Sequence, residues 1–171
     1  MNLQYTDLLD NSFHPASRVW IYQSSRLFGM SEALRLEEQL EQFTSDWKSH
    51  GTPVKATGYL FFGQFIVLIA DETASGVSGC STDGSVRFIK DIEQQYKVML
   101  FDRTALALVV KDKIQVLPMA QLGYSLENGF ISPDTLYFNN TVLNLAELRE
   151  KWIIPLKDSW LARRFPVLQT S

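Results

Sequence analysis

The sequence has a single cysteine, Cys80, and only two histidines among its 171 residues. One cysteine cannot form an intramolecular disulfide, so we expect the chain to fold in a reducing compartment. No run approaches the roughly 18 to 20 apolar residues that span a bilayer, because the longest run, residues 59–70, is interrupted by Gly63-Gln64. The first residues lack the basic and apolar regions of a secretory signal. These absences predict a cytoplasmic protein with no membrane insertion.

An excess of basic residues is also absent, since 16 Lys and Arg stand against 19 Asp and Glu, giving a net charge of −3. Such a chain has no general attraction for phosphate backbones, and nucleic-acid binding is not expected. The densest basic cluster, Arg163-Arg164 with Lys151 and Lys157 upstream, is typical of a solvated face and could also bind a partner. Hydrophobic residues at 46% and charged residues at 20% predict one folded domain over residues 1–171.

The first half of the chain predicts a strand, a helix and a hairpin. Residues 18–23 are β-branched and aromatic, as in a strand, and Ser31 is expected to cap the helix that follows. Two apolar runs, 56–62 and 65–71, predict an antiparallel hairpin. Gly63 would be the first central residue of its type II′ turn. The apolar stripe of the helix has steps of three and four: Ala33, Leu36, Leu40, Phe43 and Trp47.

The second half continues as hairpins separated by helices. Apolar residues between Val86 and Tyr96 predict a helix. Further elements are expected at residues 104–110 and 114–117 (a hairpin), 118–126 (a helix beginning at Pro118), 135–138 (a strand), 145–152 (a helix capped by Asn144) and 158–164 (a helix). This order favours an α+β fold with a mainly antiparallel sheet and helices packed on one face. A doubly wound α/β sheet is the alternative, but both hairpin connections are too short for parallel crossovers.

The small polar residues 73–83 lead into the second helix, where exposed backbone N–H groups could hold an anion. The sequence has no Gly-x-x-x-x-Gly-Lys-Ser/Thr motif, and Asp71, Glu72 and Asp83 would oppose a phosphate. The same three carboxylates could instead surround Mg²⁺ or Ca²⁺. In the simpler interpretation, Asp83 complements the helix dipole and the other two end a strand in solvent.

Cys80 lies just before that helix, where the pKa of a thiol can be lowered and the nucleophilic thiolate favoured. A thiol enzyme also needs a base, and His14 and His50 are both far away in sequence without a motif that joins either to the cysteine. A buried Cys80 acting as a small hydrophobic side chain is the alternative. No spacing among the three residues is typical of a zinc site.

Polar residues also follow apolar segments elsewhere, at Asp102-Arg103 and at Asn139-Asn140, where they could line a pocket or serve ordinary turns. Trp152 and Trp160 could form a partner surface or belong to the core. The predicted ligand-binding set joins these positions to the loop: Ser78, Gly79, Cys80, Ser81, Asp83, Asp102, Arg103 and Asn139.

Several segments resemble a family of small uncharacterised bacterial proteins found in Bacteroidetes-type genomes. They include Ser78-Gly79-Cys80-Ser81-x-Asp83, Phe138-Asn139-Asn140 and Pro155-Leu156-Lys157-Asp158-Ser159-Trp160. Some members of that family carry the label ABC transporter ATPase, which implies a Walker A loop, a Walker B acid and a signature motif. This sequence has none of the three, and the resemblance implies no other established activity.

No complete catalytic constellation can be assembled from these residues. The leading hypothesis is therefore a non-catalytic binding or interaction module with a protein or small-molecule partner. A small thiol-dependent enzyme built around Cys80 is the second hypothesis, and a binder of nucleotides or phosphorylated metabolites at residues 73–83 is the third. The sequence indicates no particular cofactor.

Overall fold

The structure is a computed structural model, and it describes residues 1–73 and 81–169, without the side chains of residues 81–83. The chain divides into two compact units. The N-terminal unit comprises residues 3–101 and 143–149, and the C-terminal unit comprises residues 1–2, 102–142 and 150–171. The single domain expected from the sequence stays a prediction.

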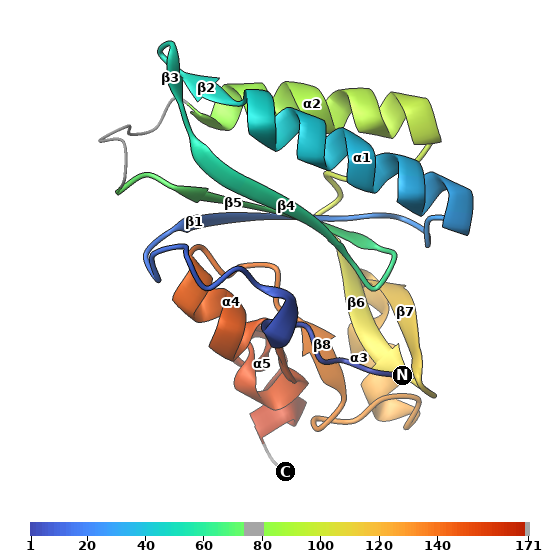
Figure 1. The fold of residues 1–171 in the computed structure, drawn as a ribbon. Helices are drawn as coiled ribbons and strands as arrows, with labels where there is room; N and C mark the ends of the chain where they lie inside the picture. Colours follow the sequence, from blue (N-terminus) through green and yellow to red (C-terminus); the bar gives the residue numbers. More distant parts are fainter. Residues whose placement is uncertain (74–80, 170–171) are drawn as a thin grey trace. The chain divides into compact units, whose positions relative to one another are not determined.

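A three-stranded antiparallel sheet organises the N-terminal unit, with the strand order β1-β5-β4. Two long helices, α1 and α2, cover one face of this sheet (Figure 1). A short hairpin, β2-β3, follows α1, and a 3-10 turn and most of the short helix α4 complete the unit. The bounds are η1 Thr6–Leu8, β1 Arg18–Gln23, α1 Met30–Asp46, β2 Lys48–Ser49, β3 Thr52–Pro53, β4 Lys55–Phe61, β5 Phe65–Asp71, α2 Ser81–Tyr96 and α4 Leu145–Lys151.

The central strand β5 is buried along its whole length because both of its faces are covered. Its alternate residues Ile66, Leu68 and Ala70 belong to one core with apolar side chains of both long helices: Leu36 and Leu40 from α1, and Ile89 and Ile92 from α2. On the opposite face, the ring of Tyr5 lies 6.0 Å from the ring of Phe61. The near-continuous apolar run of β5 is typical of a strand buried on both sides.

The C-terminal unit is built on a four-stranded antiparallel sheet with the order β7-β6-β8-β9. Its core joins Leu106, Leu108 and Tyr137 of this sheet to Leu122 and Leu161 of two short helices. The bounds are β6 Ala105–Val110, β7 Lys113–Pro118, η2 Met119–Gln121, α3 Leu122–Glu127, β8 Leu136–Phe138, β9 Ile153–Pro155, η3 Leu156–Asp158, α5 Leu161–Arg164 and η4 Pro166–Gln169.

The predicted α+β fold built from antiparallel hairpins is confirmed, although the strands fall into three sheets. The Asn144 cap is also confirmed, since its Oδ1 accepts a hydrogen bond from Glu147 N at 2.9 Å. Two short pairings, β2-β3 and β8-β9, involve strands that the sequence pattern did not indicate at residues 48–53 and 153–155. Such two- and three-residue strands are too short to show a period.

Three local predictions were wrong. The helix predicted to begin at Pro118 begins as a 3-10 turn at Met119, and Pro118 ends β7. The N-cap of α1 is Gly29 rather than Ser31, because the Glu32 carboxylate accepts the Gly29 N–H at 2.8 Å. The hairpin turn has Phe62 (φ 56°) and Gly63 (φ 64°) at its centre, which are the positive angles of a type I′ turn and not of type II′.

Candidate functional site

The predicted loop site lies largely outside the described residues. Ser78, Gly79 and Cys80 are not described, so the thiol hypothesis stays a prediction. Ser81 and Asp83 fall in the first turn of α2, and only their backbone is described. The site predicted at residues 73–83 therefore stays a prediction.

The other three predicted site residues belong to the C-terminal unit. Asp102 Oδ1 accepts hydrogen bonds from Thr104 N (2.9 Å) and Thr104 Oγ1 (2.6 Å), which lower the pKa of Asp102. Asn139 donates to the Lys151 carbonyl at 3.1 Å, and Arg103 is exposed. The contacts of Asp102 are those of a turn-forming residue, whereas the Asn139 bond reaches the last residue of α4. Their convergence with the first turn of α2, which lies in the other unit, stays a prediction.

The acidic residues at the end of β5 have structural partners. The buried Asp71 accepts hydrogen bonds from Thr73 N (3.0 Å), Thr73 Oγ1 (2.5 Å) and His14 N (3.2 Å). Burial acts to raise the pKa of Asp71, but these hydrogen bonds outweigh it and lower the pKa. Glu72 forms an ion pair with Arg18 at 3.2 Å. Among the described residues, no group of three His, Cys, Asp or Glu side chains could hold a metal ion.

The N-terminal unit carries a groove of about 440 Å³ between α1 and β4, which we name the α1–β4 groove. Its lining comes from three places: side chains of α1, which we call the wall, the middle of β4, which we call the floor, and Leu8 of the N-terminal 3-10 turn, which we call the rim and which is 65% exposed. The lining residues are Leu8, Glu37, Glu41, Thr44, Thr57, Gly58, Tyr59, Leu60 and Phe61.

Gly58 allows α1 to approach the floor of this groove. A Cβ atom at this position would lie 3.3 Å from Leu40 Cδ2 of α1 and 3.2 Å from Leu68 Cδ2 of β5. Both distances are shorter than ordinary van der Waals contact, so a side chain here would force the two leucine side chains to shift by a few tenths of an ångström. Gly58 therefore lets Leu40 of α1 pack closely on the middle of β4.

The floor of the groove is an open sheet edge. β4 is the last strand of its sheet, and in the described part of the chain nothing pairs with the outer side of residues 56–60. In an antiparallel pair, every second residue directs its N–H and C=O groups away from the partner strand. The outward N–H and C=O groups of β4 are therefore open to pairing with a chain that enters the groove.

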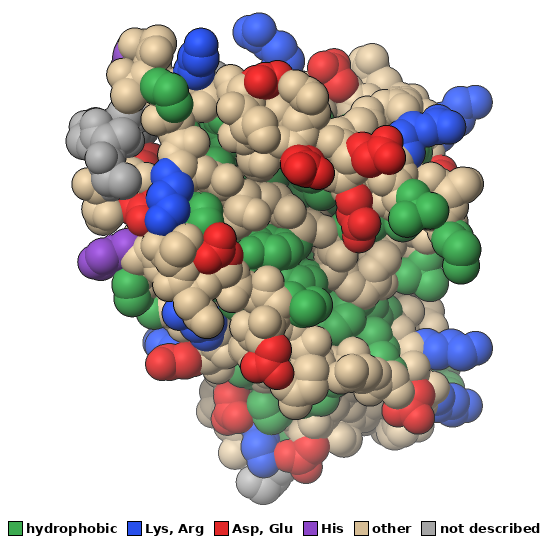
Figure 2. All heavy atoms as spheres, viewed as in Figure 1, with side chains coloured by type: hydrophobic (Ala, Val, Ile, Leu, Met, Phe, Trp, Pro, Cys, Tyr) green, Lys and Arg blue, Asp and Glu red, His purple; other side chains and the backbone are tan. Residues whose placement is uncertain are grey.

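The wall of the groove is acidic. Glu37 and Glu41 lie one helical turn apart on α1, and both are exposed. The sequence of α1 contains five acidic residues and one basic residue, Arg35. In Figure 2, several acidic side chains gather over α1. The open edge of β4 thus lies beside negative charge.

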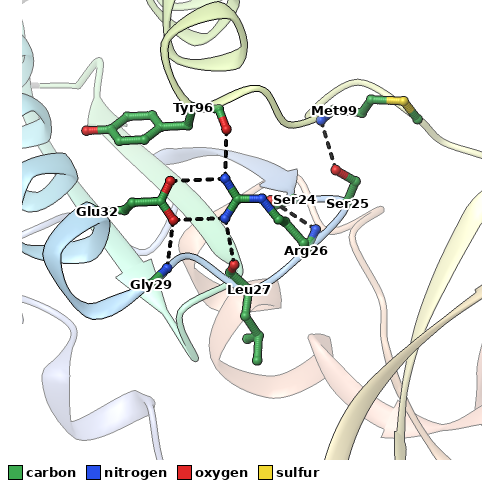
Figure 3. Close-up of polar contacts among 8 residues, drawn as sticks. All are labelled: Ser24, Ser25, Arg26, Leu27, Gly29, Glu32, Tyr96 and Met99. Carbon is green, nitrogen blue, oxygen red and sulfur yellow. Dashed lines mark hydrogen bonds and ion pairs between the residues drawn. The ribbon is translucent and has the colours of Figure 1, made fainter.

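A polar network fixes the position of the α1 wall (Figure 3). Arg26 donates two parallel hydrogen bonds to the Glu32 carboxylate, at 2.8 and 3.0 Å, and a third to the Tyr96 carbonyl at the end of α2, at 2.7 Å. The hydrogen bonds from Arg26, followed by the bond from Gly29 N, lower the pKa of Glu32 to about 2. One guanidinium thus ties the first turn of α1 to the last turn of α2.

Sequence reasoning missed the α1–β4 groove. The spacing of Glu37 and Glu41 places both on the polar side of the helix, where acidic residues ordinarily face solvent. What makes them part of a site is the contact of α1 with an edge strand. That strand lies 14 or more residues further along the chain.

Comparison of the chain with protein families, with curated proteins and with solved structures found no match. The resemblance to a bacterial family therefore stays a prediction. No helix within residues 1–73 and 81–169 is both long and apolar enough to cross a membrane.

Proposed function

We propose that this chain is a non-catalytic interaction module that binds an extended segment of a partner protein in the α1–β4 groove. The observation that carries the proposal is the open edge of β4 beneath an acidic helix wall. An added strand would pair with the outward backbone groups of β4, as in recognition by β-strand addition. The backbone bonds would give affinity, and side chains on the two faces of the added strand would give selectivity.

Charge complementarity defines the partner segment as basic. Four residues of α1 rise about 6 Å along the helix, and alternate residues of a strand are about 6.6 Å apart. Two basic side chains at alternate strand positions would therefore match Glu37 and Glu41. The residues between them would face the opposite rim, where Leu8 offers an apolar contact.

A second copy of the chain is a poorer occupant of the same groove. Pairing of β4 with β4 of another copy would bring two α1 walls together, each carrying Glu37 and Glu41. Like charges across an interface oppose association. The acidic wall therefore disfavours self-association and favours a basic partner.

The proposal is tested with a short peptide in which lysine and valine alternate, using fluorescence anisotropy on the full chain at low salt. The expected result is saturable binding that a glutamate-valine peptide does not show. Glu37→Gln with Glu41→Gln should weaken binding by about tenfold, because each exposed ion pair is worth up to about 1 kcal/mol. Glu38→Gln is the matched control, since Glu38 is also exposed on α1 but does not line the groove.

A second peptide separates strand addition from simple charge attraction. Methylation of alternate backbone nitrogens keeps both lysine charges and removes the donors that pair with β4. The methylated peptide should bind far more weakly. Equal binding of both peptides, or equal effects of the Glu37/Glu41 and Glu38 variants, would show that the groove is not the binding site.

A further inference from the structure

Three buried side-chain polar atoms of the described residues have no hydrogen-bond partner, and two of them lie close together in sequence: Trp47 Nε1 and Ser49 Oγ. Trp47 is 4% exposed and Ser49 is 2% exposed. Native structures pair nearly all such atoms with protein, water or an ion. The indole of Trp47 is fixed by ring contacts with Phe43 at 5.0 Å and Trp20 at 5.6 Å. Its N–H edge therefore has a defined direction.

That direction is the first turn of α2. A Cβ atom at Gly84, the fourth residue of α2, would lie 3.7 Å from Trp47 Nε1. Side chains of a helix tilt toward its N-terminus, so a Cβ at Gly84 covers the turn before it. Trp47 Nε1 thus lies over the N-terminal turn. Alternate residues of an extended segment point the same way, which places Ser49 on the side of Trp47.

The first turn of α2 adds donors of its own. An α-helix leaves its first four backbone N–H groups without intrahelical acceptors, and its dipole is positive at this end. The helix is 16 residues long, so the dipole is fully developed. The indole N–H can only donate, and therefore it requires an acceptor.

We propose that Trp47 Nε1, Ser49 Oγ and the first turn of α2 form a binding site for a small oxyanion, a phosphate or carboxylate group. The ligand would accept the indole N–H and the helix N–H groups, while the serine hydroxyl donates a further bond. Asp83 belongs to the same turn and carries a charge that opposes an anion, whereas Arg87 and Lys48 nearby in sequence carry the favourable charge. This site is independent of the α1–β4 groove.

The test is a titration of the ¹⁵N-labelled full chain with inorganic phosphate, with acetate, and with chloride at matched ionic strength, followed through the four indole N–H resonances. Trp152 and Trp160 are internal controls, because their Nε1 atoms already donate to Asn140 Oδ1 (3.0 Å) and Tyr137 Oη (3.2 Å). The Trp47 resonance should shift saturably while these two stay in place. Saturation by phosphate alone defines a phosphate site, and saturation by both anions defines a general oxyanion site.

Three variants complete the test. Trp47→Phe keeps the aromatic packing and removes the donor, and should weaken phosphate binding by about tenfold or more, read from the backbone amides of α2. Ser49→Ala should weaken it less and serves if Trp47→Phe fails to fold. Asp83→Asn should tighten it by removing a like charge. The proposal is overturned if chloride shifts the Trp47 resonance as phosphate does, or if Ser49→Ala and Asp83→Asn leave phosphate affinity unchanged. It is also overturned if Asp83→Asn shifts the Trp47 resonance without any phosphate present, since Asp83 would then be the acceptor of the indole N–H.

Discussion

The two outer strands of the N-terminal sheet, β1 and β4, differ in how their outer backbone groups are paired. At the start of β1, Val19 N donates to the Leu143 carbonyl at 3.0 Å, and Arg18 forms a bridge with Asn144. Just after β1, Ser25 N donates to the Met99 carbonyl at 3.0 Å. Along β4, by contrast, residues 56–60 have no backbone partner on the outer side within the described chain.

Covering a sheet edge and placing charge beside it are two of the ways in which natural proteins protect it. The start of the β1 edge follows the first route, since the segment before α4 pairs with Arg18 and Val19. The β4 edge follows the second route, through Glu37 and Glu41 on the wall above it. Charge rejects a like-charged or self-complementary strand but admits a basic one. The edge of β1 thus serves the stability of the fold, whereas the edge of β4 can select among binding partners by their charge.

The largest loss of stability is expected when the packing of the segment that covers the start of β1 is disrupted. Leu145 is fully buried at the start of α4, and its N–H donates to the Ser17 carbonyl at 2.9 Å. Leu145→Ala should lower the free energy of unfolding by about 2 to 5 kcal/mol, because it leaves a cavity in a packed core. Urea denaturation measures the change.

The matched control for that variant lies two residues earlier. Leu143 belongs to the same covering segment but is 71% exposed, so Leu143→Ala should change stability by no more than about 0.5 kcal/mol. The folded Leu145→Ala protein should bind the lysine-valine peptide with the same affinity as the unaltered chain. Similar stability losses for the two variants would show that α4 does not stabilise the β1 edge through Leu145.

A smaller loss of stability is expected when the contact between Arg26 and Glu32, at the start of α1, is removed. The folded-state pKa of Glu32 is about 2, below its ordinary value of 4.5, chiefly because Arg26 donates to its carboxylate. A lowered pKa means that the ionised form stabilises the folded state above about pH 4.5 and that this contribution is lost as the pH falls toward 2. The melting temperature of the unaltered chain should therefore exceed that of Glu32→Gln at pH 7.

The same pair of proteins should converge in acid. Their melting temperatures should approach each other between pH 4.5 and about pH 2, the interval in which Glu32 takes up its proton on unfolding. Because Glu32 is partly exposed, this difference should be smaller than that produced by Leu145→Ala. A melting-temperature difference that stays constant across the interval would contradict the role of the ionised carboxylate.

The long elements were predictable from local patterns in the sequence. The apolar stripe of α1 has the helical period, whereas the continuous apolar run of β5 has the length of a strand and follows a glycine-containing turn. The turn between β4 and β5 was not predictable, because glycine is favoured over phenylalanine at a positive φ. Tertiary contacts decide it here: the Gly63 carbonyl accepts the Phe28 N–H at 2.8 Å.

The groove and the oxyanion site were hidden for a different reason. Each joins segments that are distant in sequence, such as Leu8 with Thr57, or Trp47 with Gly84. The sequence did identify the first turn of α2 as an anion-binding position through its helix dipole. It could not indicate Trp47 as a donor, because a tryptophan in an apolar stripe is ordinarily a core residue.

Hydrogen exchange of the backbone amides tests the difference between the two edges most directly. Residues in one alternate set within 56–60 should exchange at least about 100-fold faster than the Val19 amide, since open amides lack the protection of a hydrogen bond. The other alternate set should be as slow as β5, and the fast set should become slow when the lysine-valine peptide is bound. Uniform protection of residues 56–60 in the unbound chain would contradict the open edge and the function proposed for it.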